Sequence, residues 1–323
     1  MWTLRRTARL VEPGLSIPML ALLLALAGCS RDAANPLNAS RSASASRDGA
    51  ALASGPSVSG AYFPLQVGNR WHTEAESRNR ITPTNGGPIE DFVIHDDITR
   101  VLVGTETISG RTYVVEADST EETTSTENLG SFLTWIRYRQ DASGLYEADV
   151  AISTPPALAA RVQPFPARLS ERLPEGQREA FAAAWDRVQQ RAEALRAPHR
   201  GALSAGNAAG RPGGVGAEEI TRLSYPLRPG AEWVIRGDPF FGSVVEANEN
   251  FEAPAGRFPS SRIRTVADFL GPNDLVHVWF SRSGMLALRY HLESFATDVD
   301  GNIIGTASFD YDETLRDFSL AGP

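Results

Sequence analysis

The chain has 323 residues with 31 basic and 39 acidic side chains, a formal net charge of −8 and a single cysteine. An acidic chain repels phosphate backbones, and no arginine cluster interleaved with aromatic residues offsets this, so we expect no nucleic-acid partner. One cysteine cannot form a disulfide within the chain, so packing alone must stabilise the folded part.

The first 28 residues have the features of a bacterial export signal. A basic stretch with Arg5, Arg6 and Arg9 would stay on the cytoplasmic side of a membrane during export. An almost purely apolar run follows at 15–27. A membrane-spanning helix needs about 20 residues, so this shorter run predicts a signal segment that is removed.

The apolar run ends in Leu26, Ala27, Gly28 and Cys29, which resembles the lipobox of bacterial lipoproteins. The resemblance implies that Cys29 carries diacylglycerol and becomes the acylated first residue of the mature chain. A buried thiol is the alternative, but it does not explain this order of charges, apolar residues and small residues. Ser30 stands where an aspartate would indicate inner-membrane retention in that family, so we expect a lipid anchor in the envelope, at the outer membrane.

Residues 29–60 are dominated by Ser, Ala, Gly, Asn and Arg. Such a segment buries too little apolar surface to offset the entropy of ordering. We therefore predict a disordered tether between the anchor and the folded part.

Two segments 162 residues apart share the pattern aromatic-Pro-Leu-x-x-Gly-x-x-Trp. The pattern predicts two copies of one β module, assigned to 61–160 and 222–323. We interpret its residues as structural, with a ligand-binding motif as the alternative, because proline, glycine and tryptophan all have roles in starting and packing strands. The shared positions are Pro64, Leu65, Gly68 and Trp71, repeated as Pro226, Leu227, Gly230 and Trp233.

Later landmarks repeat in the same order. Their spacing drifts, as expected if loops changed after a duplication. The matching groups are Glu106, Gly110 and Arg111 with Glu252, Gly256 and Arg257, and Trp135 and 143–145 with Trp279 and 283–285.

Alternating apolar and polar residues predict short strands, and therefore a mainly β fold of curved antiparallel sheets. In the hairpin 275–292, a two-residue loop at 283–284 would place Trp279 opposite Leu288 and Leu275 opposite Leu292. Further strands are expected at 92–103, 111–117, 131–139, 232–236, 243–251, 262–269 and 303–311.

The region 161–221 is predicted to hold one amphipathic helix and a Gly/Ala-rich linker. Apolar residues at 173–196 recur at helical spacing and form one stripe. We expect this stripe to pack on the protein itself, with docking to lipid or a partner as the alternative. The stripe residues are Phe181, Trp185, Val188, Ala192 and Leu195.

No residue pattern predicts a cofactor or a metal site. The five histidines include no His-x-x-x-His pair, and His277 and His291 point to opposite faces in the predicted hairpin. The segment 298–302 resembles a calcium loop but lacks the final glutamate, so a hairpin turn is favoured. Adjacent acid pairs on a strand, such as Asp96 and Asp97, point to opposite faces and cannot form a convergent site alone.

The lipobox together with the repeated motif resembles a loose group of bacterial lipoproteins of unknown function, some of which resemble half-barrel lipid-carrier lipoproteins. That resemblance implies a sheet curved around helices, but it transfers no functional residue. Two hypotheses follow. The first is a non-catalytic periplasmic lipoprotein, membrane-anchored, that binds an apolar ligand or an envelope protein in the concavity of its sheets. The alternative is a carboxylate-dependent envelope hydrolase, which needs two carboxylates from different strands to converge in a cleft.

Overall fold

The computed structural model describes residues 62–90, 93–149, 167–196, 218–237 and 239–322. The signal segment, the lipobox and the tether lie outside this part. The described part is mainly β, as predicted. In chain order its elements are β1 (Arg70–Pro83), β2 (Ile89–Glu90), β3 (Ile94–Ile108), β4 (Arg111–Thr123), β5 (Asn128–Gln140), β6 (Gly144–Asp149), α2 (Ala167–Glu171), α3 (Glu175–Arg196), β7 (Glu218–Ser224), β8 (Glu232–Arg236), β9 (Phe241–Ala253), β10 (Gly256–Ala267), β11 (Leu275–Ser281), β12 (Gly284–Thr297) and β13 (Ile303–Ser319).

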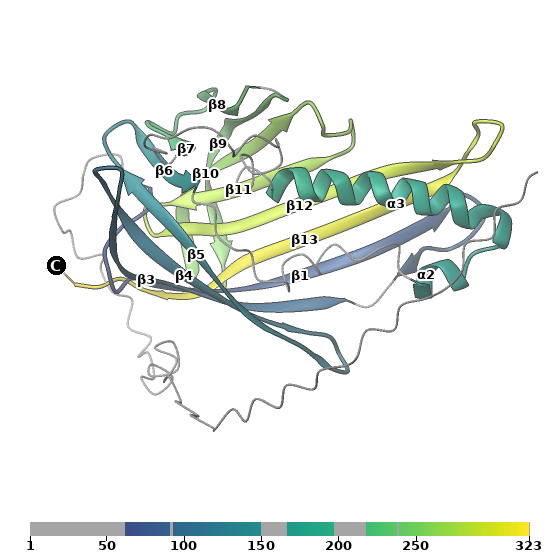
Figure 1. Cartoon of the computed structure of the whole chain (residues 1–323), viewed down its shortest axis with the longest axis horizontal. Coiled ribbons are helices and arrows are strands. Elements are labelled where there is room, and N and C mark those ends of the chain that lie inside the picture. Colours follow the sequence, from purple (N-terminus) through teal and green to yellow (C-terminus); the bar gives the residue numbers. More distant parts are fainter. Residues whose placement is uncertain (1–61, 91–92, 150–166, 197–217, 238, 323) are drawn as a thin grey trace, which may run out of the picture. The chain divides into compact units, whose positions relative to one another are not determined.

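The strands form one antiparallel sheet, so both predicted modules share a single sheet (Figure 1). Its order is β7-β6-β5-β4-β3-β1-β13-β12-β11-β10-β9-β8, with β2 added beside β1. Strands β1 and β13 pair from Arg70 to Pro83 and so join the first half to the second. Strands β7 and β8, at the two ends of the order, contact each other outside the hydrogen-bonded ladder. The sheet is therefore barrel-like and nearly closed, and we call the β7–β8 contact the seam.

The repeated landmarks occupy equivalent places in the two halves. One copy of the motif leads into β1 and the other into β8, and each of these strands begins a run of successive hairpins. The repeated glycines Gly110 and Gly256 lie in the β3–β4 and β9–β10 hairpins, while Trp135 and Trp279 lie on β5 and β11. The duplication of a β unit stays a prediction from the sequence.

The motif glycines make the same backbone contact in both halves. The amide of Gly68 donates to the carbonyl of Leu102 at 2.7 Å, and the amide of Gly230 donates to Val245 at 2.8 Å. In each case the partner's amide donates back to the residue after the glycine, at 2.9 Å. Both glycines have positive φ, 95° and 85°, which a residue with a Cβ adopts only with strain. The motif therefore fixes the chain onto the neighbouring strand.

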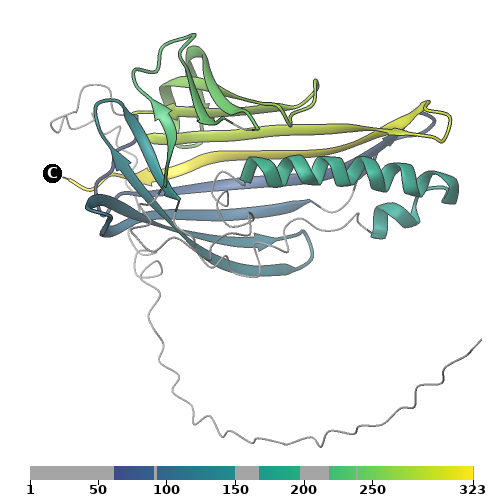
Figure 2. The same ribbon diagram turned by 45° about the horizontal axis from the view of Figure 1, so that its top comes forward.

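Helix α3 runs along β12 and β13 on one face of the sheet, which we call the inner face (Figure 2). The predicted helix is confirmed, and its apolar stripe packs on the protein itself. Phe181, Trp185 and Val188 are buried against side chains of β1, β12 and β13. Among the described residues, neither helix combines the length and apolarity needed to cross a membrane.

A second apolar cluster, rich in aromatic rings, contains no residue of α3 and includes both motif tryptophans. We call it the aromatic core. Phe63 stacks on Trp71 at 5.2 Å between ring centroids and contacts Tyr138 and Phe280. The Nε1 of Trp71 donates to the carbonyl of Ser283 at 2.6 Å, so the first motif is tied to the repeated turn of the second half.

The predicted register of the β11–β12 hairpin is wrong by one residue. Ser281 pairs with Gly284, so the loop is 282–283 and not 283–284. A pairing irregularity between Trp279 and Phe280 then shifts the register by one residue for the pairs farther from the loop. The observed pairs are Trp279 with Ala287 and Leu275 with His291, where Leu288 and Leu292 were predicted.

Four strands were not predicted as such: β1 beyond its motif tryptophan, β2, β6 and β7. Strand β1 carries charged residues on one face and mostly small residues on the inner face, where Ala75 is 4% exposed. Its apolar alternation is therefore weak, although it lies at the centre of the sheet.

Candidate functional site

Six ionisable side chains lie together on the inner face, beneath the aromatic core. They come from β3, β4, β6, β7 and β13, and they share the face of the buried residues Leu102 and Leu315. Burial of so many charges is uncommon unless they are paired. We call this group the inner charge cluster: Arg100, Glu116, Asp118, Glu147, Arg222 and Glu313.

One side of the cluster is built around Arg100. Its Nη1 donates to Glu313 at 2.6 Å and to the hydroxyl of Thr73 at 3.1 Å, while its Nε lies 3.4 Å from Asp118. Tyr311 donates its hydroxyl to Glu313 at 3.0 Å. Burial alone would raise the pKa of Glu313, but Arg100 and these hydrogen bonds hold that pKa below its ordinary value.

The other side of the cluster is an ion pair between β7 and β6. The Nε of Arg222 donates to Glu147 at 2.5 Å, and the Glu147 side chain is 6% exposed. Tyr138 lies beside this pair, and burial together with the nearby carboxylates raises its hydroxyl pKa well above the ordinary value. The tyrosine therefore stays neutral.

Glu116 lies between these two ion pairs. The residue is 1% exposed, and its Oε2 is buried without a hydrogen-bond partner among the described residues. Burial raises its pKa to about 8, more than the charges of Arg100 and Arg222 lower it. At neutral pH this carboxyl group is therefore mostly protonated.

The cluster brings together carboxylates from different strands, which the hydrolase hypothesis requires. They lie under the core, however, and not in a cleft: Glu116 and Glu313 are each 1% exposed. A general acid must reach the proton-accepting atom of a substrate. The covering side chains would have to move before any substrate could approach.

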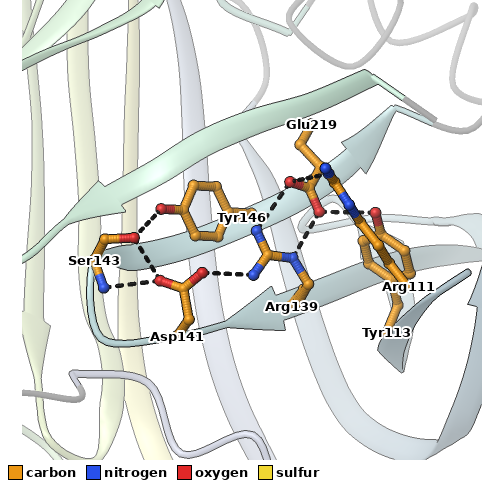
Figure 3. A network of polar contacts seen from close by, with 7 residues as sticks. All are labelled: Arg111, Tyr113, Arg139, Asp141, Ser143, Tyr146 and Glu219. Atoms are coloured by element: carbon orange, nitrogen blue, oxygen red, sulfur yellow. Dashed lines mark hydrogen bonds and ion pairs between the residues drawn. The ribbon is translucent and has the colours of Figure 1, made fainter. Parts of the chain in front are cut away.

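A second polar network lies on the opposite, outer face of β4 to β7 (Figure 3). Glu219 on β7 accepts from Arg139 at 2.7 and 3.0 Å, from Tyr113 at 2.8 Å and from Arg111 at 2.7 Å. The Arg139 hydrogen bond is the main cause that lowers the pKa of Glu219 to about 2. All the donors come from β4 and β5, so this network fastens β7 to the sheet.

The same network continues to the β5–β6 turn (Figure 3). Arg139 donates to Asp141 at 2.6 Å, and Asp141 accepts from the amide and the hydroxyl of Ser143 at 2.8 and 2.5 Å. The guanidinium also lies over the ring of Tyr146, 4.4 Å from its centroid. Each of these carboxylates is engaged, so the network is structural.

An apolar group with two exposed side chains, Leu133 and Trp135, lies on the outer face of β3 to β5. Trp135 faces Ala117, which in turn faces Val101, and Leu133 follows Trp135 on the same side of β5. Trp135 and Leu133 are each 38% exposed, and none of the described residues stacks on the Trp135 ring or accepts from its indole. We call Val101, Ala117, Leu133 and Trp135 the outer apolar patch.

The repeat provides a comparison for Trp135. Trp279, its counterpart, is 7% exposed. Its Nε1 donates to Glu249 at 2.7 Å, Phe251 packs on it at 5.2 Å between centroids, and the guanidinium of Arg289 lies over its ring. The second half thus covers this tryptophan with its own side chains, whereas the first half leaves it uncovered.

The described histidines do not form a metal site. The corrected register puts His277 and His291 on the same face, contrary to the prediction, but each binds its own carboxylate. His277 contacts Glu246 at 3.0 Å, and His291 contacts Asp310 at 2.6 Å. Across the described ranges, no group of three His, Cys, Asp or Glu side chains could hold a metal ion.

The calcium-like segment is the β12–β13 turn, as favoured from the sequence. Asp298 accepts from the amides of Asp300 and Asn302 at 3.0 and 2.8 Å, which is the pattern of an Asx turn. Its carboxylate is therefore occupied by the turn itself.

A shallow groove of about 440 Å³ runs between α3 and β12. Two of its lining arginines are engaged in holding the helix. Arg187 donates to the carbonyl of Phe295 at 2.7 Å, and Arg191 donates to Asp274 at 2.9 Å. The groove follows from how α3 is attached to the sheet.

Of the residues predicted to matter, the lipobox and Cys29 lie outside the described part, and the repeat residues have structural contacts. The inner charge cluster was missed. Its members are single charged residues within strands, and such residues usually face solvent. Only the position of Glu116 between apolar neighbours on both sides in sequence could have signalled burial.

No protein-family model and no curated relative matches this chain. Two solved structures are distantly similar. One is a candidate lipoprotein from Parabacteroides distasonis, with a TM-score of 0.30, 10% identity, and coverage of 80% of this chain and 98% of that one. The other is a candidate exported protein with a YmcC-like fold from Bacteroides fragilis, with a TM-score of 0.28, 12% identity, and coverage of 80% and 98%. Nothing is transferred from either to this chain.

Proposed function

We propose that this chain is a lipid-anchored lipoprotein of the bacterial envelope, and that its β body is a non-catalytic module that binds another envelope protein through the outer apolar patch. The anchor part of the proposal depends on the order of arginines, apolar run, small residues and Cys29. The 29–60 segment would let the body reach partners away from its own attachment point.

The anchor has a direct test. Replacing Cys29 with alanine should abolish labelling by radioactive fatty acid and release the protein from the membrane fraction. Unchanged acyl labelling in the Cys29→Ala chain would refute the anchor.

The observation that carries the binding proposal is the uncovered ring of Trp135. The inner face, where an apolar ligand was expected from the sequence, is filled by α3, the aromatic core and the inner charge cluster. A ligand there would have to displace them. Trp135 and Leu133 of the outer apolar patch are exposed, and tryptophan is enriched at the centres of protein interfaces. Binding at the outer face is therefore favoured over an apolar ligand inside the sheet.

A photo-crosslinking amino acid at Leu133, in cells that make the full chain, tests the patch. It should give one discrete adduct, and Trp135→Ala should reduce that adduct about tenfold or more by removing a central contact. Val266→Ala is the matched control, because Val266 is 39% exposed on β10 in the other half. Equal adduct yield with Trp135→Ala and Val266→Ala would count against the patch.

A further inference from the structure

The inner charge cluster contains one carboxyl group more than its ion pairs use. Arg100 is bound to Glu313 and Asp118, and Arg222 is bound to Glu147. Glu116 remains, and its buried Oε2 has no hydrogen-bond partner among the described residues. If it were ionised, the cluster would hold four carboxylates against two guanidinium groups.

Ionisable groups surround Glu116 from every strand near it. They are Arg100 on β3, Asp118 on β4, Tyr138 on β5, Glu147 on β6 and Arg222 on β7. An ionised Glu116 would lose hydration, repel Asp118 and Glu147, and find both guanidinium groups already engaged. A proton on Glu116 removes these costs, which agrees with its raised pKa of about 8.

The consequence of losing that proton falls on β7. This strand pairs in the ladder only with β6, from Gly144 with Ser224 to Asp149 with Glu218, and it borders the seam on its other side. On the inner face it is held by the pair of Arg222 with Glu147 and by Leu223, which is buried in the aromatic core. A charge on Glu116 would compete with Glu147 for Arg222 and weaken that attachment.

We propose that Glu116 carries a proton in the folded protein at neutral pH, and that loss of this proton loosens β7 and makes the seam a pH-operated opening to the inner face. This inference does not depend on the outer apolar patch or on any partner. On the outer face the Glu219 network stays ionised and bonded over the same pH range, so the change is confined to the inner attachment.

The test uses the full chain in a non-ionic detergent at about pH 6.5 and about pH 9. Infrared spectra should show the absorption of a neutral carboxyl group at the lower pH that disappears at the higher one and is missing from Glu116→Gln. Amide hydrogen exchange of 218–224 in the original chain, with labelling times scaled to the intrinsic rate at each pH, should be about tenfold faster at the higher pH than at the lower one. In Glu116→Gln, which keeps a neutral side chain, the scaled exchange rate of this segment should be the same at both pH values.

The chain suits this measurement because it contains no lysine, so few other groups titrate over this range. The matched control is Glu219→Gln, which should speed exchange of β7 at both pH values without altering the infrared change. If Glu116→Gln folds poorly, Glu116→Leu serves as a second neutral variant. The proposal is overturned if the neutral-carboxyl absorption is unchanged in the Glu116 variant, or if β7 loosens with pH in the variant as it does in the original chain.

Discussion

At the scale of single residues, the repeated motifs act through backbone geometry. Gly284, in the second copy of the repeated turn, has a φ of 112° and lies directly against Trp71 of the first motif. A Cβ at this position would be 2.8 Å from the indole Nε1 that donates to Ser283. Two constraints therefore meet at one glycine.

We predict that Gly284→Ala destabilises the fold by about 2–4 kcal/mol, because it adds a clash with Trp71 to the strain of positive φ. Gly110→Ala is the matched control: φ is 78° there, but nothing lies within 4 Å of the added Cβ. The control should cost about 1 kcal/mol from strain alone. Urea denaturation measures both, and equal losses would mean that the contact with Trp71 adds nothing.

Residue-level reasoning from the sequence singled out the motif and missed the inner charge cluster. Pro64, Gly68 and Trp71 form a pattern that can be recognised in the local sequence. Glu116 and Arg100 are ordinary strand residues, and their burial depends on which other strands curve over them. That information is absent from the local sequence.

At the scale of elements, α3 was predictable because its stripe repeats over about four turns, and four of the five stripe residues are buried as expected. Phe181 is fully buried and reaches Gly305, whose absent Cβ leaves room for the ring. The register of the β11–β12 hairpin was not predictable, because a single irregularity after Trp279 shifts every pair beyond it.

We predict that Phe181→Ala lowers the free energy of unfolding by about 3–5 kcal/mol, since it opens a cavity between α3 and the sheet. Asp186→Ala, on the exposed side of the same helix, should change it by less than about 0.5 kcal/mol. Both can be measured by urea denaturation followed by circular dichroism. A small effect of Phe181→Ala would show that α3 packs loosely on the inner face.

At the scale of the whole molecule, the repeated motifs left open whether the two predicted modules fold as one sheet or as two domains. The structure joins them through the long pairing of β1 with β13, the first and the last long strands. Residues that are farthest apart in sequence thus lie at the centre of the sheet, and no local pattern predicts such a pairing. The same arrangement leaves the seam between β7 and β8, which are close in sequence but unpaired in the ladder.

This topology predicts that the chain can be cut between its halves and still assemble. A break within 197–217 separates β1 to β6 and α3 from β7 to β13. Co-expressed fragments should co-purify at equal amounts, because two ladders, β1 with β13 and β6 with β7, span the break. Expressed alone, each fragment exposes a long central strand as an edge and should aggregate.

The control variant is Ala75→Pro on β1, which removes a ladder donor opposite Glu313 and should abolish the association. Two fragments that each fold as a stable monomer would show instead that the halves are independent domains.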